Sequence, residues 1–529
     1  MSVDWGYTVP PDQGGGDIAK ALAQAPPSQK LPPGRWARKN LFNTPLNSVI
    51  TVVLGTISLY LAYRFARFVF VTGQWEPVRR NLELFMISQY PRDERWRIVA
   101  QLILMAGAIG AAAGSLRAAS IDTAVDTGEP RKAYGWRTYV NSYWAVVLFV
   151  ATVMGAFVRT IGPWLILGAA VVLGVVTYLI CGFLPARLRL WRWTIAGILA
   201  VVSFQMVSGT GGWAWFFLTL ALTPVVRDEI ARLLDPASPT VSWALVVVGF
   251  VAGVYGFIEV GGVGLFGIVF LAAGVYGIIQ MAMGDRLDAA GTGAVMIVGL
   301  AVYLVYAAIG LDGIDWEDWG GLHLTLVMTV GAILLAFPLG MLLALGRRSS
   351  LPAVRVMSVA YIELFRGTPL ITWLLTAQFF LGFFLDSETQ LSLITRAMVA
   401  ITLFSAAYVA EIIRGGLQSV PAGQIEAGQA MGLSQAKIMR LIVMPQALRA
   451  VIPAMVGQFI SLFKDTTLLG IIAINEFLGV RRLVHSQSDF LRLGIAETLV
   501  FCAFGFWAVA FTMSRESQRL ERKLSVGRR

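Results

Sequence analysis

Long apolar runs recur along this chain and limit what it can fold into. Several runs of about 20 residues are long enough, as helices, to cross a hydrocarbon layer roughly 30 Å thick. The chain is 57% apolar and only 14% charged, whereas soluble domains average about 25% charged residues. The sequence therefore predicts an all-α membrane protein.

Fourteen apolar runs are candidate spans, with boundaries defined to within several residues. The first nine lie near 48–72, 97–116, 141–158, 163–184, 193–208, 212–226, 241–258, 264–283 and 290–309. The last five lie near 321–346, 357–384, 392–414, 446–469 and 495–514. The hairpin of the fifth and sixth runs is the weakest, so the prediction is about 12–14 transmembrane helices.

The candidate spans are of two kinds. The first nine are nearly free of ionisable residues, with Arg64 and Arg67 as the main exceptions, and are rich in small residues that permit close helix packing. A charge at the bilayer centre costs at least ~2.5 kcal/mol, so charged residues there usually line a pathway or pair with one another. The last five spans concentrate such residues: Glu363, Arg366, Glu411, Arg414, Lys464 and Asp465. Transport is therefore predicted in the last five, and the first nine are interpreted as a scaffold or partner-binding addition, with a second role left open.

One polar segment lies between the third and fourth of these last five spans. It runs from Pro421 through Gly432 to Pro445. Proline at the start and glycine at the end are typical of a short helix, because glycine accepts the left-handed conformation of a helix C-terminus. Ser434 can then cap a second helix that meets Pro445. The segment is too polar and too short to span a bilayer, so it is predicted to lie at the surface, either as a docking element for a soluble partner or as a passive connector.

The spacing of this segment resembles the EAA loop of ABC importer permeases, which reads Glu-Ala-Ala, three residues, Gly, nine residues and Ile-x-Leu-Pro. This chain has Gly428 where the pattern has Ala and Met444 where it has Leu. The blocks 361–370, 407–416 and 458–468, in that order, resemble the polar amino acid branch of these permeases, and the resemblance covers roughly 321–524. More weakly, residues 81–96 resemble the enlarged permeases of broad-specificity (general L-amino acid) importers.

The resemblance implies a fold, partners and a role. The fold would be a C-terminal five-helix core of the type I ABC importer class. The loop would dock on an ATPase subunit through four residues: Glu426, Ala427, Gly428 and Gly432. The partners would be an ATPase dimer, a second and related permease subunit, and an extracytoplasmic amino acid-binding protein, besides membrane lipid. ATP and Mg²⁺ would stay on the ATPase, and the chain itself would be no enzyme and bind no cofactor. No lysine in the chain follows a glycine, so it has no P-loop of its own.

Polar residues of the last five spans are candidates for the substrate path. The set is Glu363, Arg366, Thr368, Gln378, Tyr408, Glu411, Lys464, Asp465 and Thr466. The sequence Arg366-Gly-Thr-Pro369 predicts a broken helix that exposes carbonyls. It serves either as a substrate contact or as a kink in which Arg366 pairs with Glu363 or Asp465.

The other candidates also have two interpretations each. Lys464 and Asp465 offer a cation and an anion to an amino acid zwitterion, or they neutralise each other. Glu411 and Arg414, one turn apart, are more typical of a structural pair. Tyr408 and Gln378 are polar enough to line a path but are also compatible with helix packing.

Charge distribution predicts the orientation and the domains. The resemblance implies the bacterial plasma (inner) membrane, and the clustering of basic residues in short loops on one side predicts that both termini are cytoplasmic. Two groups of arginines, 79–95 and 481–492, fall on the other side and dissent. The predicted domains are a disordered tail at 1–47, additional transmembrane helices at 48–310, a permease core at 311–515 with its loop at about 421–445, and a basic tail at 516–529.

Other function classes are excluded or held as rivals. The net charge of +11 is spread over those short loops, so no nucleic-acid binding is predicted. Cys181 and Cys502 both fall in candidate spans, and His323 and His485 stand far apart, so neither a disulfide nor a metal site is predicted. The rivals are a secondary transporter, which would use membrane carboxylates to bind H⁺ or Na⁺, and a membrane scaffold that transports nothing.

Overall fold

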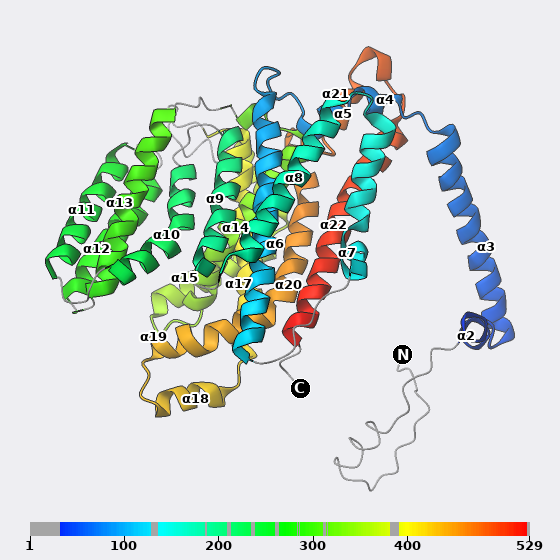
Figure 1. Ribbon diagram of the computed structural model, residues 1–529. Coiled ribbons are helices and arrows are strands. Elements are labelled where there is room, and N and C mark those ends of the chain that lie inside the picture. Colours follow the sequence, from blue (N-terminus) through cyan, green and yellow to red (C-terminus); the bar gives the residue numbers. More distant parts are fainter. Residues whose placement is uncertain are drawn as a thin grey trace, which may run out of the picture. The chain divides into compact units, whose positions relative to one another are not determined.

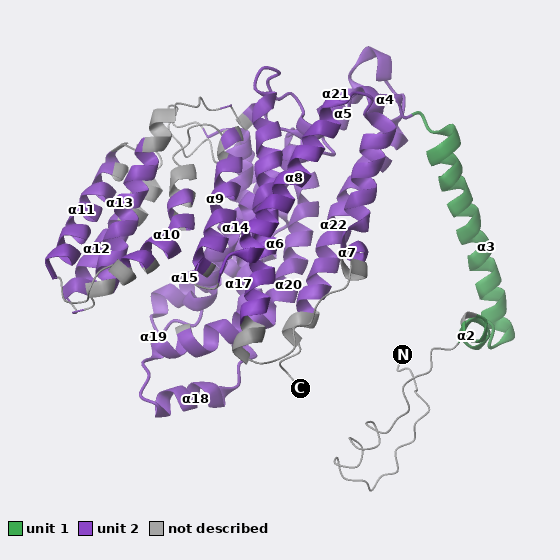
Figure 2. Ribbon diagram, viewed as in Figure 1, with its two compact units in different colours: residues 1–74 green, residues 75–529 purple. Residues whose placement is uncertain are grey.

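The computed structural model describes residues 32–127, 136–185, 188–208, 213–233, 239–259, 264–282, 284, 286–309, 314, 316–380 and 391–525. These residues form helices joined by turns, with one isolated β-bridge between Gly321 and Glu476. The chain divides into two compact units, residues 1–74 and residues 75–529 (Figure 2). The predicted all-α class is confirmed.

Within the described residues, eight helical stretches are long and apolar enough to cross a membrane. They are Pro45–Thr72, Arg95–Asp122, Val140–Phe157, Gly162–Phe183, Gly321–Gly346, Leu393–Gln418, Leu441–Ile472 and Ile495–Glu521. Shorter apolar helical stretches are Leu190–Phe204, Pro239–Tyr255, Leu271–Ala282, Asp288–Leu304 and Leu370–Phe379. The predicted spans between 193 and 309 thus coincide mostly with the shorter helices.

The first unit contains two helices, α2 (Pro33–Asn40) and α3 (Pro45–Arg67). A π-helical turn, Phe68–Thr72, extends α3. Thr44 caps α3 by accepting a hydrogen bond from the backbone N–H of Asn47 at 3.2 Å. Helix α2 lies inside the segment 1–47 that was predicted to be a disordered tail, and residues 1–31 of that segment lie outside the described residues.

The second unit begins with ten helices that precede the predicted permease core. They are α4 (Glu76–Arg80), α5 (Leu82–Ile87), α6 (Arg95–Thr127), α7 (Trp136–Thr152), α8 (Gly162–Phe183), α9 (Arg189–Ser208), α10 (Trp213–Leu233), α11 (Pro239–Glu259), α12 (Gly264–Ala282) and α13 (Arg286–Ile309). Small residues let α6 and α8 approach closely, as predicted. A Cβ atom at Gly110 would overlap the backbone of Gly174, and the hydroxyl of Thr177 donates to the carbonyl of Gly107 at 2.7 Å.

The remaining helices are α14 (Gly321–Gly346), α15 (Pro352–Gly367), α16 (Leu370–Phe379), α17 (Leu393–Gln418), α18 (Ala422–Ala430), α19 (Gln435–Ile438), α20 (Met444–Asp465), α21 (Arg481–His485) and α22 (Ile495–Ser525). Helix α17 is the central one, packing against α14, α15, α16 and α20. The predicted break at Gly367–Pro369 is confirmed, because Thr368 is extended and separates α15 from α16.

Helices from both halves of the second unit share one hydrophobic core. Helix α7 packs along α22, where the ring of Phe149 lies 5.4 Å from that of Phe504. Phe85 of α5 is fully buried against Phe477 and Phe501. Helix α18 and the C-terminal end of α22 lie at one end of this bundle, and α4, α5 and α21 lie at the other (Figure 1).

Candidate functional site

The Pro421–Pro445 loop has the predicted local geometry. Helix α18 begins after Pro421, and the chain turns at Gly432, whose φ of +72° confirms the predicted left-handed conformation. The hydroxyl of Ser434 accepts from the backbone N–H of Lys437 at 3.4 Å, which caps α19 as predicted. The chain then stays helical through a π-helical segment, Met439–Val443, so that Pro445 lies in the first turn of α20.

One side of this loop is packed against the protein, and the other side is exposed. Gly428 is its buried helical residue, and a Cβ there would lie 3.0 Å from Ile438 and 3.1 Å from Ile442. The departure from the alanine of the EAA pattern therefore suits the tight contact of α18 with α19. Glu426 and Ala427 are exposed, and Met431 is 77% exposed. Helix α18 of this loop lies at one end of the bundle (Figure 1).

Charged side chains from three helices meet around Glu411 of α17. Arg414 contacts it at 2.7 Å, which confirms the predicted pair one turn apart. Arg347, at the end of α14, contacts the same carboxylate at 2.7 Å, and Arg366 of α15 approaches it at 3.5 Å. Arg347 also lies 3.5 Å from Glu363. Three arginines thus surround two glutamates, so the group carries one excess positive charge.

Arg366 has different neighbours from those that its kink interpretation predicted. Within the described residues it pairs with Glu411 and not with Glu363 or Asp465, because its helix packs on α17. Its guanidinium lies 5.7 Å from the ring centre of Tyr408, a cation–π distance. The side chain of Arg366 remains 37% exposed, so it keeps donors for a further partner.

Lys464 and Asp465 end α20 and form a second polar group with Thr466. In the described part of the chain neither charge has an ion-pair partner, so the predicted mutual neutralisation is not seen there. Lys464 is exposed and Asp465 is half-buried. Thr466 is fully buried, and its hydroxyl donates to the carbonyl of Phe463 at 2.6 Å.

The structure brings some of the predicted path residues together and leaves others apart. Four of them belong to one group, in which Arg366 contacts Glu411 and Tyr408, and Glu363 is joined through Arg347. A hydrophobic cluster that contains Phe365, Leu462 and Leu469 lies beside both groups. Tyr408 of the first group packs against it, and Leu462 and Leu469 flank the second group in sequence. Thr368 donates to the carbonyl of Leu364 at 3.1 Å. The carbonyl of Gln378 accepts from Arg396 at 3.1 Å. Neither contact of Thr368 or Gln378 reaches the two charged groups.

The sequence interpretation missed Arg347 as a member of the Glu411 group. The pair Arg347-Arg348 directly follows an apolar run and is one of the short basic loops that indicate the orientation. A cation at the end of one span, together with a carboxylate one turn inside another, was the available signal. It did not specify which helices are neighbours.

The opposite end of the bundle carries a buried carboxylate, Glu476. Its side chain is fully buried and accepts hydrogen bonds from the backbone N–H groups of Leu478 at 2.7 Å and Gly479 at 2.6 Å. Burial raises the pKa of Glu476 to about 7, and the two backbone donors and Arg482 oppose that rise.

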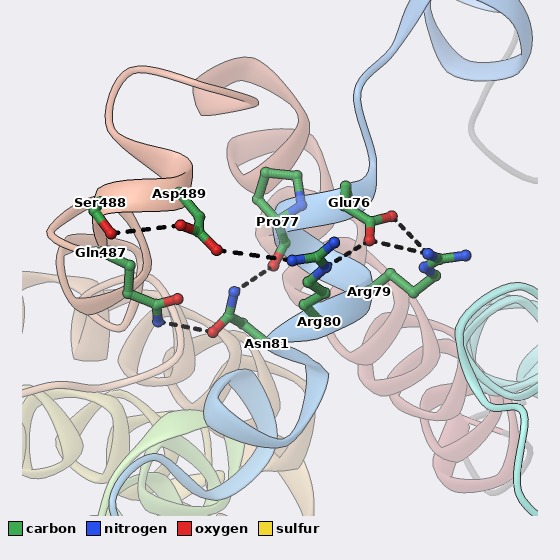
Figure 3. A network of polar contacts seen from close by, with 8 residues as sticks. All are labelled: Glu76, Pro77, Arg79, Arg80, Asn81, Gln487, Ser488 and Asp489. Carbon is green, nitrogen blue, oxygen red and sulfur yellow. Dashed lines mark hydrogen bonds and ion pairs between the residues drawn. The ribbon is translucent and has the colours of Figure 1, made fainter.

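A network of polar contacts at this end joins α4 to the segment before α22 (Figure 3). Glu76 accepts from Arg80 at 2.7 Å and pairs with Arg79 at 2.8 Å, and these bonds lower the pKa of Glu76. Arg80 also pairs with Asp489 at 3.8 Å. The amide of Gln487 donates to the side-chain oxygen of Asn81 at 2.8 Å, across 406 residues of sequence. The start of the second unit is thereby tied to the last loop before α22.

Comparison with known proteins places these features in a family. Residues 336–526 match the family described as binding-protein-dependent transport system inner membrane component. The chain is 39% identical over 323 residues to the glutamate/glutamine/aspartate/asparagine transport system permease protein of Rhodobacter capsulatus, covering 58% of this chain and 71% of that protein. It is 42% identical over 228 residues to an inner membrane amino-acid ABC transporter permease protein of Escherichia coli K12, covering 43% and 62%. A probable glutamine ABC transporter permease protein of Bacillus subtilis is 34% identical over 209 residues, covering 38% of this chain and 91% of that protein.

Proposed function

The chain belongs to the family of binding-protein-dependent transport system inner membrane components, and from this premise we propose how it carries its substrates. It is the membrane-spanning permease subunit of an ABC importer of amino acids. We propose further that it is of the enlarged, broad-specificity type. Two observations support this: the R. capsulatus relative is named for four amino acids, and the B. subtilis relative matches only 38% of this much longer chain.

The proposed complex contains an ATPase dimer, a second and related permease subunit and an extracytoplasmic amino acid-binding protein. ATP and Mg²⁺ bind the ATPase, and this chain catalyses no reaction. The exposed side of the Pro421–Pro445 loop, with Glu426, Ala427 and Met431, is the proposed contact with the ATPase. In this proposal the loop and both termini are cytoplasmic. The C-terminal end of α22 lies at the same end of the bundle as α18, which supports that orientation for the C-terminus.

The packing of the loop suggests how ATP hydrolysis reaches the substrate path. Gly428 of α18 contacts Ile438 of α19 and Ile442 of the π-helical segment, and both segments continue directly into α20. Helix α20 packs on α17 and ends at Lys464 and Asp465. A displacement of α18 by the ATPase therefore moves the helix that carries the second polar group against the helix that carries Glu411.

The two charged groups are the proposed binding points for an amino acid zwitterion. Arg366 is partly exposed in a group with one excess positive charge, so it suits the α-carboxylate. Asp465 has no ion-pair partner among the described residues, so it suits the α-ammonium. The single observation that carries this assignment is the missing Lys464–Asp465 pair, because a half-buried carboxylate without a counter-ion is costly unless a ligand supplies one.

Reconstitution tests this function against its two rivals. The complex with the ATPase, the partner permease and the binding protein is placed in proteoliposomes, and uptake of labelled glutamate, glutamine, aspartate and asparagine is measured. We expect uptake only with ATP on the ATPase side and with the binding protein on the other. Uptake by this chain alone under an ion gradient would support a secondary transporter that uses Glu363 and Asp465. ATP-dependent uptake that persists without this chain would leave it a scaffold.

A further inference from the structure

Helix α2 separates its residues into two faces. Arg35, Arg38 and Lys39 follow the i, i+3, i+4 spacing that places side chains on one side of a helix. Trp36 flanks that side, roughly 60° from Lys39 around the helix, and Ala37 lies opposite the basic residues. All three basic side chains are exposed, and Trp36 is 51% exposed. Basic residues and a tryptophan on one short helix beside a candidate membrane span are compatible with a position in the membrane interface.

The turn after α2 fixes it next to the first membrane span. The hydroxyl of Thr51, in the second turn of α3, donates to the carbonyl of Leu41 at 2.8 Å. The side chains of Asn47 and Asn43 are joined at 2.6 Å, and the N–H of Leu41 donates to the carbonyl of Ala37 at 2.7 Å. Figure 1 views α2 nearly along its axis and α3 from the side, so α2 runs across the beginning of α3.

The position of α2 beside the candidate span indicates what surrounds Trp36. The candidate span Pro45–Thr72 begins four residues after Leu41, so α2 ends within about 14 Å of its first residue at roughly 3.4 Å per residue. At that level the surrounding material is lipid headgroup and the upper part of the acyl chains. Trp36, Leu41 and Phe42 are 51%, 37% and 45% exposed and belong at that depth. The basic residues then lie at the level of the phosphates.

We propose that Pro33–Phe42 is a binding surface for anionic phospholipid, with Arg35, Arg38 and Lys39 on the headgroup phosphates and Trp36 among the acyl chains. The surface holds the first unit on one leaflet independently of the substrate path. Each Lys or Arg near an anionic surface contributes about 1 kcal/mol. Neutralising all three is therefore expected to lower the ratio of docked to undocked α2 roughly 100-fold. The effect should weaken with salt, because the Debye length falls to about 3 Å at 1 M.

The experiment measures the depth of α2 in the full complex. A nitroxide is attached at Ala37→Cys in a Cys181→Ser, Cys502→Ser background. The complex is placed in nanodiscs of phosphatidylcholine with or without phosphatidylglycerol. We expect the label to be more accessible to oxygen than to a nickel chelate in the anionic discs, and the reverse in pure phosphatidylcholine. The triple change Arg35→Gln, Arg38→Gln, Lys39→Gln should abolish the difference between the two lipids.

Charge-preserving and aromatic variants complete the test. The matched control Arg35→Lys, Arg38→Lys, Lys39→Arg should retain lipid-dependent depth, and Trp36→Ala should lose depth while Trp36→Phe keeps most of it. Equal nickel accessibility in both lipids, or an unaltered result in the triple Gln variant, would overturn the proposal. Shielding of the label from both reagents only when the other subunits are present would assign the surface to a protein partner instead. ATPase stimulation of the same samples reports separately on transport.

Discussion

Glu411 and Glu476 are two shielded carboxylates with different partners. Glu411 is surrounded by arginines from three helices and is neutralised by them. Glu476 receives two backbone N–H groups, and these compensate its burial only in part, so its pKa rises to about 7. The first carboxylate organises a charged group, whereas the second is sensitive to pH near neutrality.

The sensitivity of Glu476 predicts a pH dependence of stability. Its pKa in the folded protein, about 7, is above the value of 4.5 for an unperturbed group. The stability that its protonation provides is therefore complete below about pH 4.5 and is lost as the pH rises through 7. The unfolding temperature of the purified subunit should fall between pH 6 and pH 8. Glu476→Gln keeps an acceptor without a charge and should flatten that slope, while the exposed control Glu426→Gln should not. Parallel slopes for Glu476→Gln and the wild type would contradict the assignment.

Asp465 predicts a loss of activity without a loss of assembly. Because no cation among the described residues depends on it, Asp465→Asn should leave the complex intact with normal basal ATP hydrolysis. A hydrogen bond to a charged group contributes about 1.5–3 kcal/mol, so the apparent affinity for the amino acid should fall roughly 10- to 100-fold. Uptake kinetics measure this change. Asp489→Asn, at the exposed outer network, is the control.

The alternative to a substrate contact makes the opposite prediction. If Asp465 neutralises Lys464 or Arg366 in the assembled complex, Asp465→Asn should reduce assembly, and Lys464→Met with Asp465→Leu should partly restore it. A well-assembled Asp465→Asn complex with unaltered affinity and rate would defeat both interpretations.

At the scale of elements, local rules predicted much of the loop and of the helix break. Proline and glycine signals located α18, the left-handed Gly432 and the separation of α15 from α16, because these depend on residues close in sequence. The Glu411–Arg414 pair is equally local. Three other contacts depend on which helices are neighbours: Arg366 with Glu411, Arg347 with Glu411, and Gln487 with Asn81. Apolar periodicity in a membrane carries little of that information, since lipid-facing and protein-facing sides are both apolar.

The loop predicts a coupling defect at Gly432. Its φ is +72°, and a Cβ there would meet no atom within 4 Å. Gly432→Val should therefore act through backbone strain alone, at roughly 1–2 kcal/mol, and misplace α18. Substrate-stimulated ATP hydrolysis should fall while the subunit stays in the membrane, and Glu426→Ala should have a similar effect.

Gly423, in the same helix, offers a matched control for that prediction. A Cβ at Gly423 also meets open space, and its φ is not in the left-handed range. Gly423→Ala should thus keep full stimulation of ATP hydrolysis. Equal and full stimulation of ATP hydrolysis in Gly432→Val and Gly423→Ala would show that this hydrolysis does not depend on the position of α18.

At the scale of the whole molecule, some of the outer arginines that dissented from the topology rule have partners. Arg79 and Arg80 pair with Glu76, Arg95 pairs with Glu83, and Arg482 donates to the carbonyl of Gly470 at 2.5 Å. The positive-inside rule counts Lys and Arg in short loops, and acidic neighbours change it little, so these arginines still dissent from the predicted orientation.

Residues before the predicted core boundary also complete the core itself. Val78 and Phe85 belong to the same buried cluster as Phe477 and Phe501, and Tyr90 and Ile98 belong to the cluster around α17. The boundary at 310, inferred from charge content, therefore differs from the packing boundary at Trp75. Because the early spans carry few charges, their sequence did not indicate that they pack against the charged spans of the core.

This packing predicts how the chain tolerates truncation. A chain of residues 310–529 exposes the ring surfaces of Phe477 and Phe501 that Phe85 covers, and it loses the α7 contact with α22. It should express poorly and fail to assemble with the ATPase. A chain of residues 75–529 keeps every contact of the second unit and should assemble and import amino acids. Copurification with the ATPase and uptake measure both outcomes.

A single substitution in the complete chain distinguishes the effect of lost packing at Phe85 from the effect of shortening the chain. Phe85→Ala removes a fully buried ring, which typically costs about 3–5 kcal/mol, and should lower the unfolding temperature of the complete chain. Phe70→Ala removes a ring that is 85% exposed and should leave that temperature unaltered. If residues 310–529 assemble and transport normally and Phe85→Ala is as stable as Phe70→Ala, the early helices are an addition after all. If both truncated chains fail while Phe85→Ala is stable, the first unit has a role in assembly that the packing of the second unit does not explain.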